Sequence, residues 1–273
     1  MNEVEKARKN KKKKPYHGTQ TVMRAMAILN MFTDEQPEWA LADLAEAVDL
    51  NRTTTYRLLT ALESTDMVVR NNQNDAQKYR YRLGSGAIVL GGRALRASSL
   101  RAITRPELGR LAAKTGETVT LEILNGDQTL MLDEEKGSYM VGMLSSVGNR
   151  WPAHASSTGK VLLAYLPEPD LVRILPDELP PITSNTITGR GAFMTLLGEV
   201  RTQGYAITRD ELEIGYSDLA VPLFNAAGQA VAALAIGGAT PRFTPERCQE
   251  ILPWLTAAAG VISHQLGYRM KEE

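Results

Sequence analysis

The stretch LADLAEAVDLNRTTTYRLLTALE, residues 41–63, decides the fold. Apolar residues recur every three or four positions in both halves, which is the spacing of two amphipathic helices. Between the halves, Asp49 stands where a tight turn is expected, and Asn51 is a suitable N-cap for the second helix. The expected buried positions are Leu41, Leu44, Ala45 and Val48 in the first helix, and Thr54, Leu58, Leu59 and Leu62 in the second. This pattern predicts a helix-turn-helix.

The other face of the second predicted helix is polar and cationic. A helix-turn-helix places its second helix in the major groove of DNA, where side chains reach base edges and phosphates. Arginine can donate two hydrogen bonds to guanine, threonine offers a hydroxyl and a methyl group, and tyrosine can reach a phosphate. The candidate DNA-binding residues of this helix are Arg52, Thr53, Thr55, Tyr56 and Arg57 on this face, together with Thr54. The alternative is a merely solvated helix face.

Two short strands are expected next, at residues 67–70 and 78–83, separated by a polar segment. In the second strand, aromatic and apolar residues alternate with cations, so that one face is aromatic and the other basic. This strand directly follows the helix-turn-helix, which predicts a DNA-contacting wing. Its candidate contacts are Lys78, Arg80 and Arg82. A preceding helix is expected from Thr21, its N-cap, with Val22, Met26 and Leu29 in its apolar stripe.

The net charge of zero hides an asymmetry along the chain. Through Arg96 there are 16 Lys and Arg residues against 11 Asp and Glu, so the remainder is acidic. A basic N-terminal third indicates that this part meets a polyanion. Residues 1–18 are lysine-rich and nearly without apolar residues, which predicts a disordered basic arm. This arm either assists DNA binding or is a solvated tail.

Composition also excludes several classes of protein. The single cysteine, Cys248, has no partner for a disulfide or a cysteine-based metal cluster. No apolar run approaches the roughly 18 residues of a membrane span, and no secretory signal is seen, so a cytoplasmic location is expected. No Cys/His/Asp metal set and no phosphate-cradling glycine loop is found, so neither a metal nor a cofactor is predicted.

The rest of the chain predicts a linker and a second domain. Residues 84–96 are rich in small residues, and helical spacing resumes near Leu100. Expected strands cover 118–124, 129–133, 139–144, 205–208, 219–224 and 230–236, and expected helices cover 157–166, 169–175, 191–203 and 244–267. Asn125 and Gly126 form a strong hairpin signal. Because several strands are joined as hairpins, an antiparallel α+β sheet is favoured over a doubly wound one.

From Gln20 to Leu266 the chain resembles the isocitrate lyase regulator (IclR) family of bacterial transcription factors. The resemblance is carried by residues 41–63 and by the blocks YRYRLG, WPAHASSTGKVLLA, GYAITRDELEIGYSDLAVPLF and GQAVAALAIGGATPRFT, in that order. Asp49 and Asp66 stand where such proteins usually have turn glycines, and aspartate is among the few residues that tolerate a left-handed backbone.

The resemblance implies a DNA-binding regulator with an N-terminal winged helix-turn-helix, a helical linker and a C-terminal antiparallel-sheet, GAF-like effector-binding domain. The expected parts are a disordered arm at 1–18, the winged helix-turn-helix at 19–84, the linker at 85–112, and an effector-binding and oligomerisation domain at 113–273. Expected partners are double-stranded operator DNA, a small-molecule effector (an organic acid, aromatic or sugar-derived compound), and further copies in a homodimer or dimer of dimers. The alternative is a C-terminal domain that only oligomerises.

The resemblance also maps an effector pocket. Its expected residues are Met140, Met143, Ser157, Thr158, Asp210, Tyr216, Asp218, Ala235 and Gly237. Ser157 and Thr158 lie at a helix start, where free N–H groups favour a carboxylate. Where many members have a cysteine this chain has Asp218, and where many have serines it has Ala235 and Gly237, which favours a ligand with hydroxyl or amine donors at that end.

A structural or solvent-exposed role is the alternative for several of these residues. Asp218 can instead cap a strand end or pair with Arg209. Asp210, with Glu211 and Glu213, also fits a solvated loop, and His154 fits a structural role better than that of a base or metal ligand.

An enzyme interpretation rests on fragments of the penicillin-binding signature: Ser157-Thr158-Gly159-Lys160, Ser217-Asp218 and Lys114-Thr115-Gly116. The third piece precedes the first and the second is broken at Leu219, so no enzyme is predicted. A labelled β-lactam is therefore expected to leave Ser157 unmodified.

Overall fold

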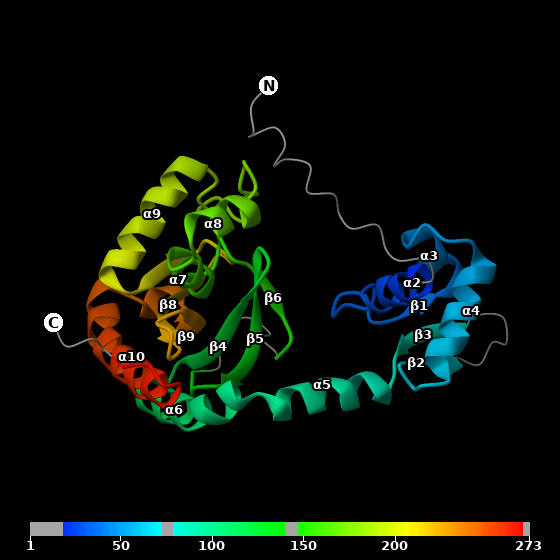
Figure 1. The fold of residues 1–273 in the computed structure, drawn as a ribbon, viewed down its shortest axis with the longest axis horizontal. Coiled ribbons are helices and arrows are strands. Elements are labelled where there is room, and N and C mark those ends of the chain that lie inside the picture. Colours follow the sequence, from blue (N-terminus) through cyan, green and yellow to red (C-terminus); the bar gives the residue numbers. More distant parts are fainter. Residues whose placement is uncertain (1–18, 73–78, 140–146, 270–273) are drawn as a thin grey trace. The chain divides into compact units, whose positions relative to one another are not determined.

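The computed structural model describes residues 19–72, 79–139 and 147–269. Its contacts divide the chain into two compact units, Met1–Ala94 and Leu95–Glu273. Both units combine helices with an antiparallel sheet, which confirms the predicted α+β class (Figure 1). The arm expected at residues 1–18 and most of the strand expected at 139–144 lie outside the described residues.

The first unit is a winged helix-turn-helix, as predicted. Strand β3 lies between β1 and β2 in an antiparallel sheet, and three helices complete the head. The elements are α2 (Gln20–Leu29), β1 (Trp39–Ala40), α3 (Leu41–Ala47), α4 (Arg52–Glu63), β2 (Val68–Asn72) and β3 (Tyr79–Leu83). The core consists of Ile28, Leu44, Leu58, Leu59, Val68 and Tyr81. Strand β1 has two residues, too few for a periodic signal, and it was not predicted.

Two aspartates make the tight turns of this head. Asp49 has a φ of 51° and Asp66 a φ of 56°, both in the left-handed region that aspartate tolerates better than most residues. Asn51 then starts α4, because its side chain accepts a hydrogen bond from the Thr54 amide at 2.8 Å. The expected N-cap at Asn51 is therefore confirmed.

The first helix differs from its prediction. It begins at Gln20 after Thr19, so Thr21 is inside the helix and does not cap it. Ile28 is the residue of α2 that is buried, whereas Val22 and Met26 of the predicted apolar stripe are 62% and 49% exposed. Part of the apolar face of α2 is therefore uncovered within a single chain.

The segment between the head and the second sheet is two helices. Helix α5 (Ser85–Ala97) has no buried residue, and α6 (Ser99–Thr115) follows after Ser98, which caps it. Leu108 and Leu111 of α6 are wholly buried in the core of the second unit. The linker expected at 85–112 therefore consists of two different parts. Helix α5 connects the head to the second unit, and α6 packs in the core of the second unit.

The second unit is built on one antiparallel sheet with the strand order β6-β5-β4-β9-β8-β7. Gly126 turns the β4–β5 hairpin and Gly228 the β8–β9 hairpin, with φ of 67° and 74°. The strands are β4 (Thr118–Asn125), β5 (Gln128–Glu135), β6 (Arg150–Pro152), β7 (Ala206–Arg209), β8 (Tyr216–Phe224) and β9 (Ala230–Ala239). Strand β6 is too short to show a period and was not predicted.

Helices cover both faces of this sheet (Figure 1). Alternate residues of β8 point to opposite sides, so that Leu219 packs with α6 and α10 (Pro245–Gln265), and Ala220 packs with the other helices. Those other helices are α7 (Ser157–Ala164), α8 (Glu168–Ile174) and α9 (Arg190–Gln203). Within the described part of the chain, no helix is both long and apolar enough to cross a membrane.

Candidate DNA-binding surface and effector cavity

The exposed face of α4 carries most of the predicted base-reading residues. Arg52, Thr53, Tyr56 and Arg57 are exposed, with Tyr56 at 44%, and Thr54 is partly exposed. Thr55 was placed on this face by the sequence, but it is wholly buried and its hydroxyl donates to the Asn51 carbonyl. The first buried residue of α4 is therefore Thr55, and not Thr54 as the sequence predicted.

The wing presents two of its three predicted cations. Arg80 and Arg82 of β3 are exposed, whereas Tyr81 between them is buried in the core of the head. Lys78 lies outside the described residues. The alternation expected for β3 thus places one aromatic ring inward and two guanidinium groups outward.

Arg70 joins the wing to α4, a role that the sequence did not suggest. Its guanidinium donates two hydrogen bonds to the Glu63 carboxylate, at 2.7 and 2.8 Å. It also lies 5.7 to 5.9 Å from the ring centres of the three tyrosines Tyr56, Tyr79 and Tyr81. These contacts hold Tyr56 of α4 beside the wing. No sequence signal reports them, because Arg70 is on β2 and its partners are on α4 and β3.

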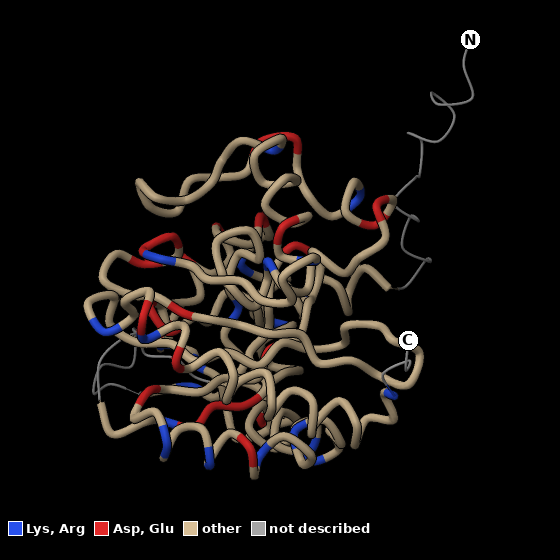
Figure 2. Tube along the Cα trace, turned by 90° about the vertical axis from the view of Figure 1, so that its left-hand side faces the viewer, with Lys and Arg blue, Asp and Glu red and all other residues tan. Residues whose placement is uncertain are grey.

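A groove of about 580 Å³ lies between these elements. Its walls include two exposed guanidinium groups, of Arg52 on α4 and Arg80 on β3, together with the tyrosine cluster around Arg70. In the second unit, by contrast, charges of both signs follow one another along the outer helices (Figure 2), and several pair, as Arg110 does with Glu107. The cationic groove suits a phosphate backbone.

The second unit contains a small cavity between α7 and the sheet. Its volume is about 20 Å³, which is room for about one water molecule. Both carboxylates that border it, those of Glu122 and Asp218, are buried, with 5% and 8% of their surface exposed. The described lining residues are Thr120, Glu122, Met131, Trp151, Ser156, Leu212, Tyr216 and Asp218.

Asp218 is held at the start of α7. It accepts hydrogen bonds from the Ser157 hydroxyl at 2.6 Å and from the Thr208 hydroxyl, and the Ser157 amide also donates to it. Burial raises the pKa of Asp218 above its usual value, against the effect of these hydrogen bonds. Arg209 does not pair with Asp218, because its guanidinium donates to the Phe243 carbonyl.

Glu122 is the partner carboxylate, and the sequence prediction missed it. Its oxygens accept from the Thr158 hydroxyl at 2.8 Å and the Thr120 hydroxyl at 3.2 Å. Burial again raises the pKa of the carboxyl, and the nearby charge of Asp218 adds to the rise. In sequence, Glu122 is one polar residue in an alternating strand, which is the pattern of a solvent-facing position.

A buried ion pair stands next to these carboxylates. The Lys160 ammonium donates to Glu211 at 2.5 Å, and both side chains are almost fully enclosed. Burial lowers the pKa of Lys160, and the charge of Glu211 opposes that effect. The expected solvated loop is therefore wrong for Glu211, although Glu213 is exposed.

Tyr216 borders the cavity, and its ring packs against Gly237. A Cβ at position 237 would overlap the Tyr216 hydroxyl, so glycine leaves the space that the ring fills. Ala235 is 2% exposed and belongs to the core that packs against α7 and α9. Neither Ala235 nor Gly237 borders the cavity, so their expected ligand contacts are not seen there.

Other predicted residues have structural roles or are outside the described chain. Asp210 has a φ of 58° and accepts from the Gly215 amide and the Thr240 hydroxyl, both at 2.7 Å, which makes it part of a turn and not of the cavity. His154 hydrogen-bonds to the Pro180 carbonyl, in line with the structural role expected of it. Met140 and Met143 lie outside the described residues.

The enzyme-like string at α7 has carboxylate partners. The Ser157 hydroxyl donates to Asp218, and the Lys160 ammonium donates to Glu211. A lysine that assists a serine nucleophile would have to accept the serine's proton, and neither recorded contact serves that purpose. No group of three or more possible metal ligands is found among the residues that the structure describes.

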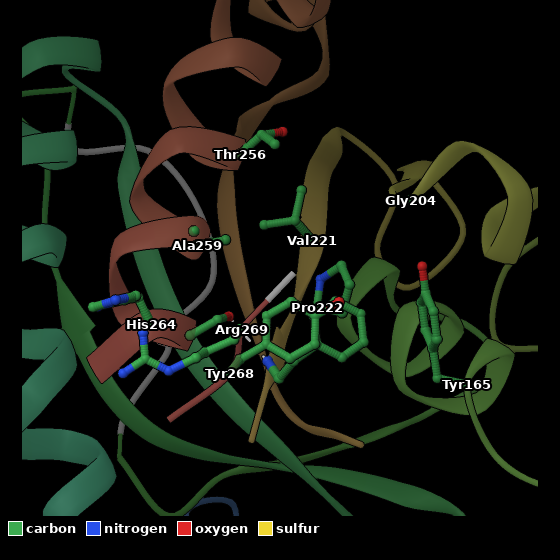
Figure 3. A pocket seen from close by; sticks show the side chains of 12 residues that line it. Tyr165, Gly204, Val221, Pro222, Thr256, Ala259, His264, Tyr268 and Arg269 are labelled. Carbon is green, nitrogen blue, oxygen red and sulfur yellow. Dashed lines mark hydrogen bonds between the residues drawn. The ribbon is translucent and has the colours of Figure 1, made fainter. Parts of the chain in front are cut away.

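A larger groove, of about 820 Å³, lies elsewhere on the second unit (Figure 3). Thr256 and Ala259 of α10 border one side, Val221 and Pro222 of β8 the floor, and Tyr165 the far side. Strand β7 pairs with β8 only as far as Ala220, so the groove follows an edge of β8 without a paired strand. Its lining is largely apolar and contains none of the buried charged groups described above.

Comparison with known proteins agrees with this architecture. The family model described as "IclR helix-turn-helix domain" matches residues 21–72, and "Bacterial transcriptional regulator IclR C-terminal" matches residues 92–264. Among curated relatives, the HTH-type transcriptional regulator XynR of Escherichia coli K12 is 30% identical, covering 91% of this chain and 98% of XynR. KdgR of the same organism is 32% identical, covering 91% of this chain and 93% of KdgR.

A solved structure is similar over nearly the same length. The IclR transcriptional regulator from Alicyclobacillus acidocaldarius is 31% identical, with a TM-score of 0.79 and coverage of 90% of this chain and 98% of that one. The two matching family models together account for the head and for the second unit. The chain therefore belongs to the IclR family of helix-turn-helix transcriptional regulators.

Proposed function

We propose that this regulator binds a two-fold operator through α4 and the wing, and that a small molecule bound at the Glu122–Asp218 cavity changes this binding. The observation that supports the DNA contact best is the cationic groove. Arg52 and Arg80, from separate elements, border it, while Arg70 holds Tyr56 beside the wing. Exposed arginines on the second helix of a helix-turn-helix are the usual readers of guanine.

The test of this contact is alanine substitution of the exposed arginines. Arg52→Ala and Arg57→Ala should each weaken operator binding by about 1–3 kcal/mol, about fivefold to 150-fold, the range for lost base contacts. Their unfolding temperature should stay that of the wild type, because both side chains are exposed. Arg173→Ala, whose side chain on α8 is 75% exposed, is the matched control. Unchanged operator affinity at fixed salt in both α4 variants would remove the assignment.

We also propose that the protein acts as a symmetric dimer formed through α2 and α5. Both helices leave large apolar side chains uncovered: Val22, Met23 and Met26 on α2, and Ile88, Val89 and Leu90 on α5. Contiguous exposed apolar residues mark contact surfaces, and two-fold pairing lets two heads read two half-sites. This places oligomerisation at least partly on the connecting helix, and not in the second unit alone.

The sensing role follows from the second unit's buried polar cavity. Burying a carboxylate lowers the stability of the folded protein, and such destabilising groups are found mainly at functional sites. A ligand changes operator binding only through its different affinity for conformations that do and do not fit the operator. Relatives are named as transcriptional regulators, and the partners of Ser157 and Lys160 give no support to a catalytic role.

A further inference from the structure

We infer that the effector presents a hydrogen-bond donor, a hydroxyl or a protonated amine, to Asp218 and Glu122, and that it does not present a carboxylate there. This inference rests on the proposed sensing role of the cavity and names the chemistry of its ligand. It agrees with the expectation drawn from Asp218, and it departs from the expectation, drawn from the start of α7, that a carboxylate binds at this point.

The first step is that the anion position at the start of α7 is already filled. Asp218 accepts from both the amide and the hydroxyl of Ser157, so its carboxylate occupies the place that a helix N-terminus offers to an acid. The Gly159 amide is also taken, because the Ser156 hydroxyl oxygen accepts from it. A ligand carboxylate would therefore have to displace the chain's own.

The second step is that four hydroxyls, those of Thr120, Ser157, Thr158 and Thr208, donate to the two carboxylates. Each hydroxyl donates one hydrogen bond. Thr158 and Thr120 donate to Glu122, and Thr208 donates to Asp218. The carboxylate oxygens retain further lone pairs, so the lining offers a ligand two buried acceptor groups. A ligand group that donates is the complement of such a lining.

The third step is the charge of the site. The ammonium of Lys160 is paired with Glu211, so it does not neutralise Asp218 and Glu122 by direct contact. Within the described residues the side chains that hydrogen-bond to these two carboxylates are hydroxyl-bearing ones, and burial raises the pKa of both carboxyl groups. A bound anion would add negative charge to the site, whereas a ligand group that donates hydrogen bonds would stabilise the negative charge already there.

The fourth step is that the site contains space. The cavity has about the volume of one water molecule, which suits one hydroxyl or ammonium group. Met131, Trp151 and Leu212 supply apolar surface for the carbon skeleton.

The experiment compares three probes that differ in one group: benzylamine, benzyl alcohol and benzoate. Thermal unfolding of the full chain is followed with each probe at equal concentration and neutral pH. Benzylamine and benzyl alcohol should raise the unfolding temperature in proportion to their binding, and benzoate should not. A larger rise with benzylamine indicates a cationic effector, and a larger rise with benzyl alcohol a neutral hydroxylic one.

Asp218→Asn is the variant that ties the result to this site. It should weaken benzylamine binding at least about tenfold and improve benzoate binding, because the amide removes the charge and adds a donor. Glu122→Gln tests the second carboxylate if the first variant folds poorly. Asp170→Asn makes the same chemical change on the surface of α8, at a side chain 40% exposed, and should leave all three probes unaffected.

The outcomes separate this inference from the proposed function. A larger stabilisation by benzoate than by the other two probes, or equal probe binding by Asp218→Asn and the wild type, overturns the ligand class. No stabilisation by any probe also overturns it, provided that the same preparation binds its operator. A preparation that is folded but binds no operator overturns the proposed function instead.

Discussion

At the scale of single residues, the most informative pair is Glu122 and Asp218. Both carboxyl groups are buried and both have a raised pKa, caused first by burial. A group whose folded pKa is raised contributes stability that is fully present below its unfolded pKa and is lost as the pH rises through the folded pKa. Each ionised carboxylate therefore lowers stability at neutral pH.

Glu122→Gln should therefore raise the unfolding temperature at neutral pH. We expect a rise of about 2–4 °C, the shift that about 1 kcal/mol gives in a protein of this size. The gain should shrink as the pH falls and vanish below the unfolded value of 4.5, where the wild-type carboxyl is protonated in both states. Calorimetry across this pH range measures it, with Glu250→Gln, 51% exposed, as the control. A gain that is independent of pH would contradict the assignment.

A second prediction concerns Gly237 and Tyr216. Gly237→Ala should destabilise the second unit by about 1–3 kcal/mol, the usual cost of overpacking, because the new methyl group overlaps the tyrosine ring. Adding Tyr216→Leu should restore part of that loss. Chemical denaturation of the wild type, the two single variants and the double variant gives the interaction energy between the two positions. If the two effects are simply additive, the packing described for this pair is wrong.

At the scale of elements, the sequence predicted most helices and strands but not their shortest members. Capping and hairpin signals depend only on neighbouring residues, so they can be recognised in the sequence. Asn51 was predicted as the N-cap of α4 and is one, and the helix predicted from residue 244 begins after its N-cap, Thr244. Strands β1 and β6 have two and three residues, too few for a period. Thr55 was misplaced because a run of threonines gives no apolar signal for the phase of the helix.

The candidate site was less predictable than the fold for a related reason. Ser157, Thr158, Tyr216 and Asp218 were found through their motifs, and all contribute to or border the cavity. Glu122 and Thr208 were missed, because their roles depend on contacts with residues 36 and 10 positions away in the chain. Composition and periodicity carry no information about such contacts.

The prediction at this scale concerns α5. Ile88 is 78% exposed on a helix that has no buried residue, so Ile88→Asp should place a charge in the proposed dimer contact. The dimer dissociation constant should rise at least about tenfold, which corresponds to about 1.4 kcal/mol. Sedimentation velocity over a range of concentrations measures this. Val172→Asp on α8, where Val172 is 59% exposed, is the control. An unchanged dissociation constant would rule out α5 as a contact.

At the scale of the whole molecule, the sheet offers a route from the cavity to the connecting helices. The pairing of β4 with β5 shifts register between Leu121 and Glu122, so Met131 borders the cavity while Asp133 pairs with α6. Arg101 and Arg105, near the start of α6, both contact Asp133. These contacts connect β5 to the start of α6, just after Ser98, where α5 meets α6.

Asp133→Asn should weaken this connection without removing either binding site. The variant should bind operator and the preferred probe of the cavity much as the wild type does. The ratio of operator affinities with and without that probe should move towards one, because the coupling free energy is reduced. Fluorescence anisotropy with operator duplex measures the ratio. A variant whose ratio equals that of the wild type would show that coupling takes another route.

The central claim is that the head formed by residues 41–83 docks on duplex DNA through its cationic surface. The most direct measurement is the affinity of the full chain for its own promoter duplex as a function of salt concentration. The logarithm of the affinity should fall linearly with the logarithm of the salt concentration, and Arg80→Ala should reduce the slope by about 1 if that residue contacts a phosphate. An absence of salt-sensitive affinity for this duplex would contradict the claim.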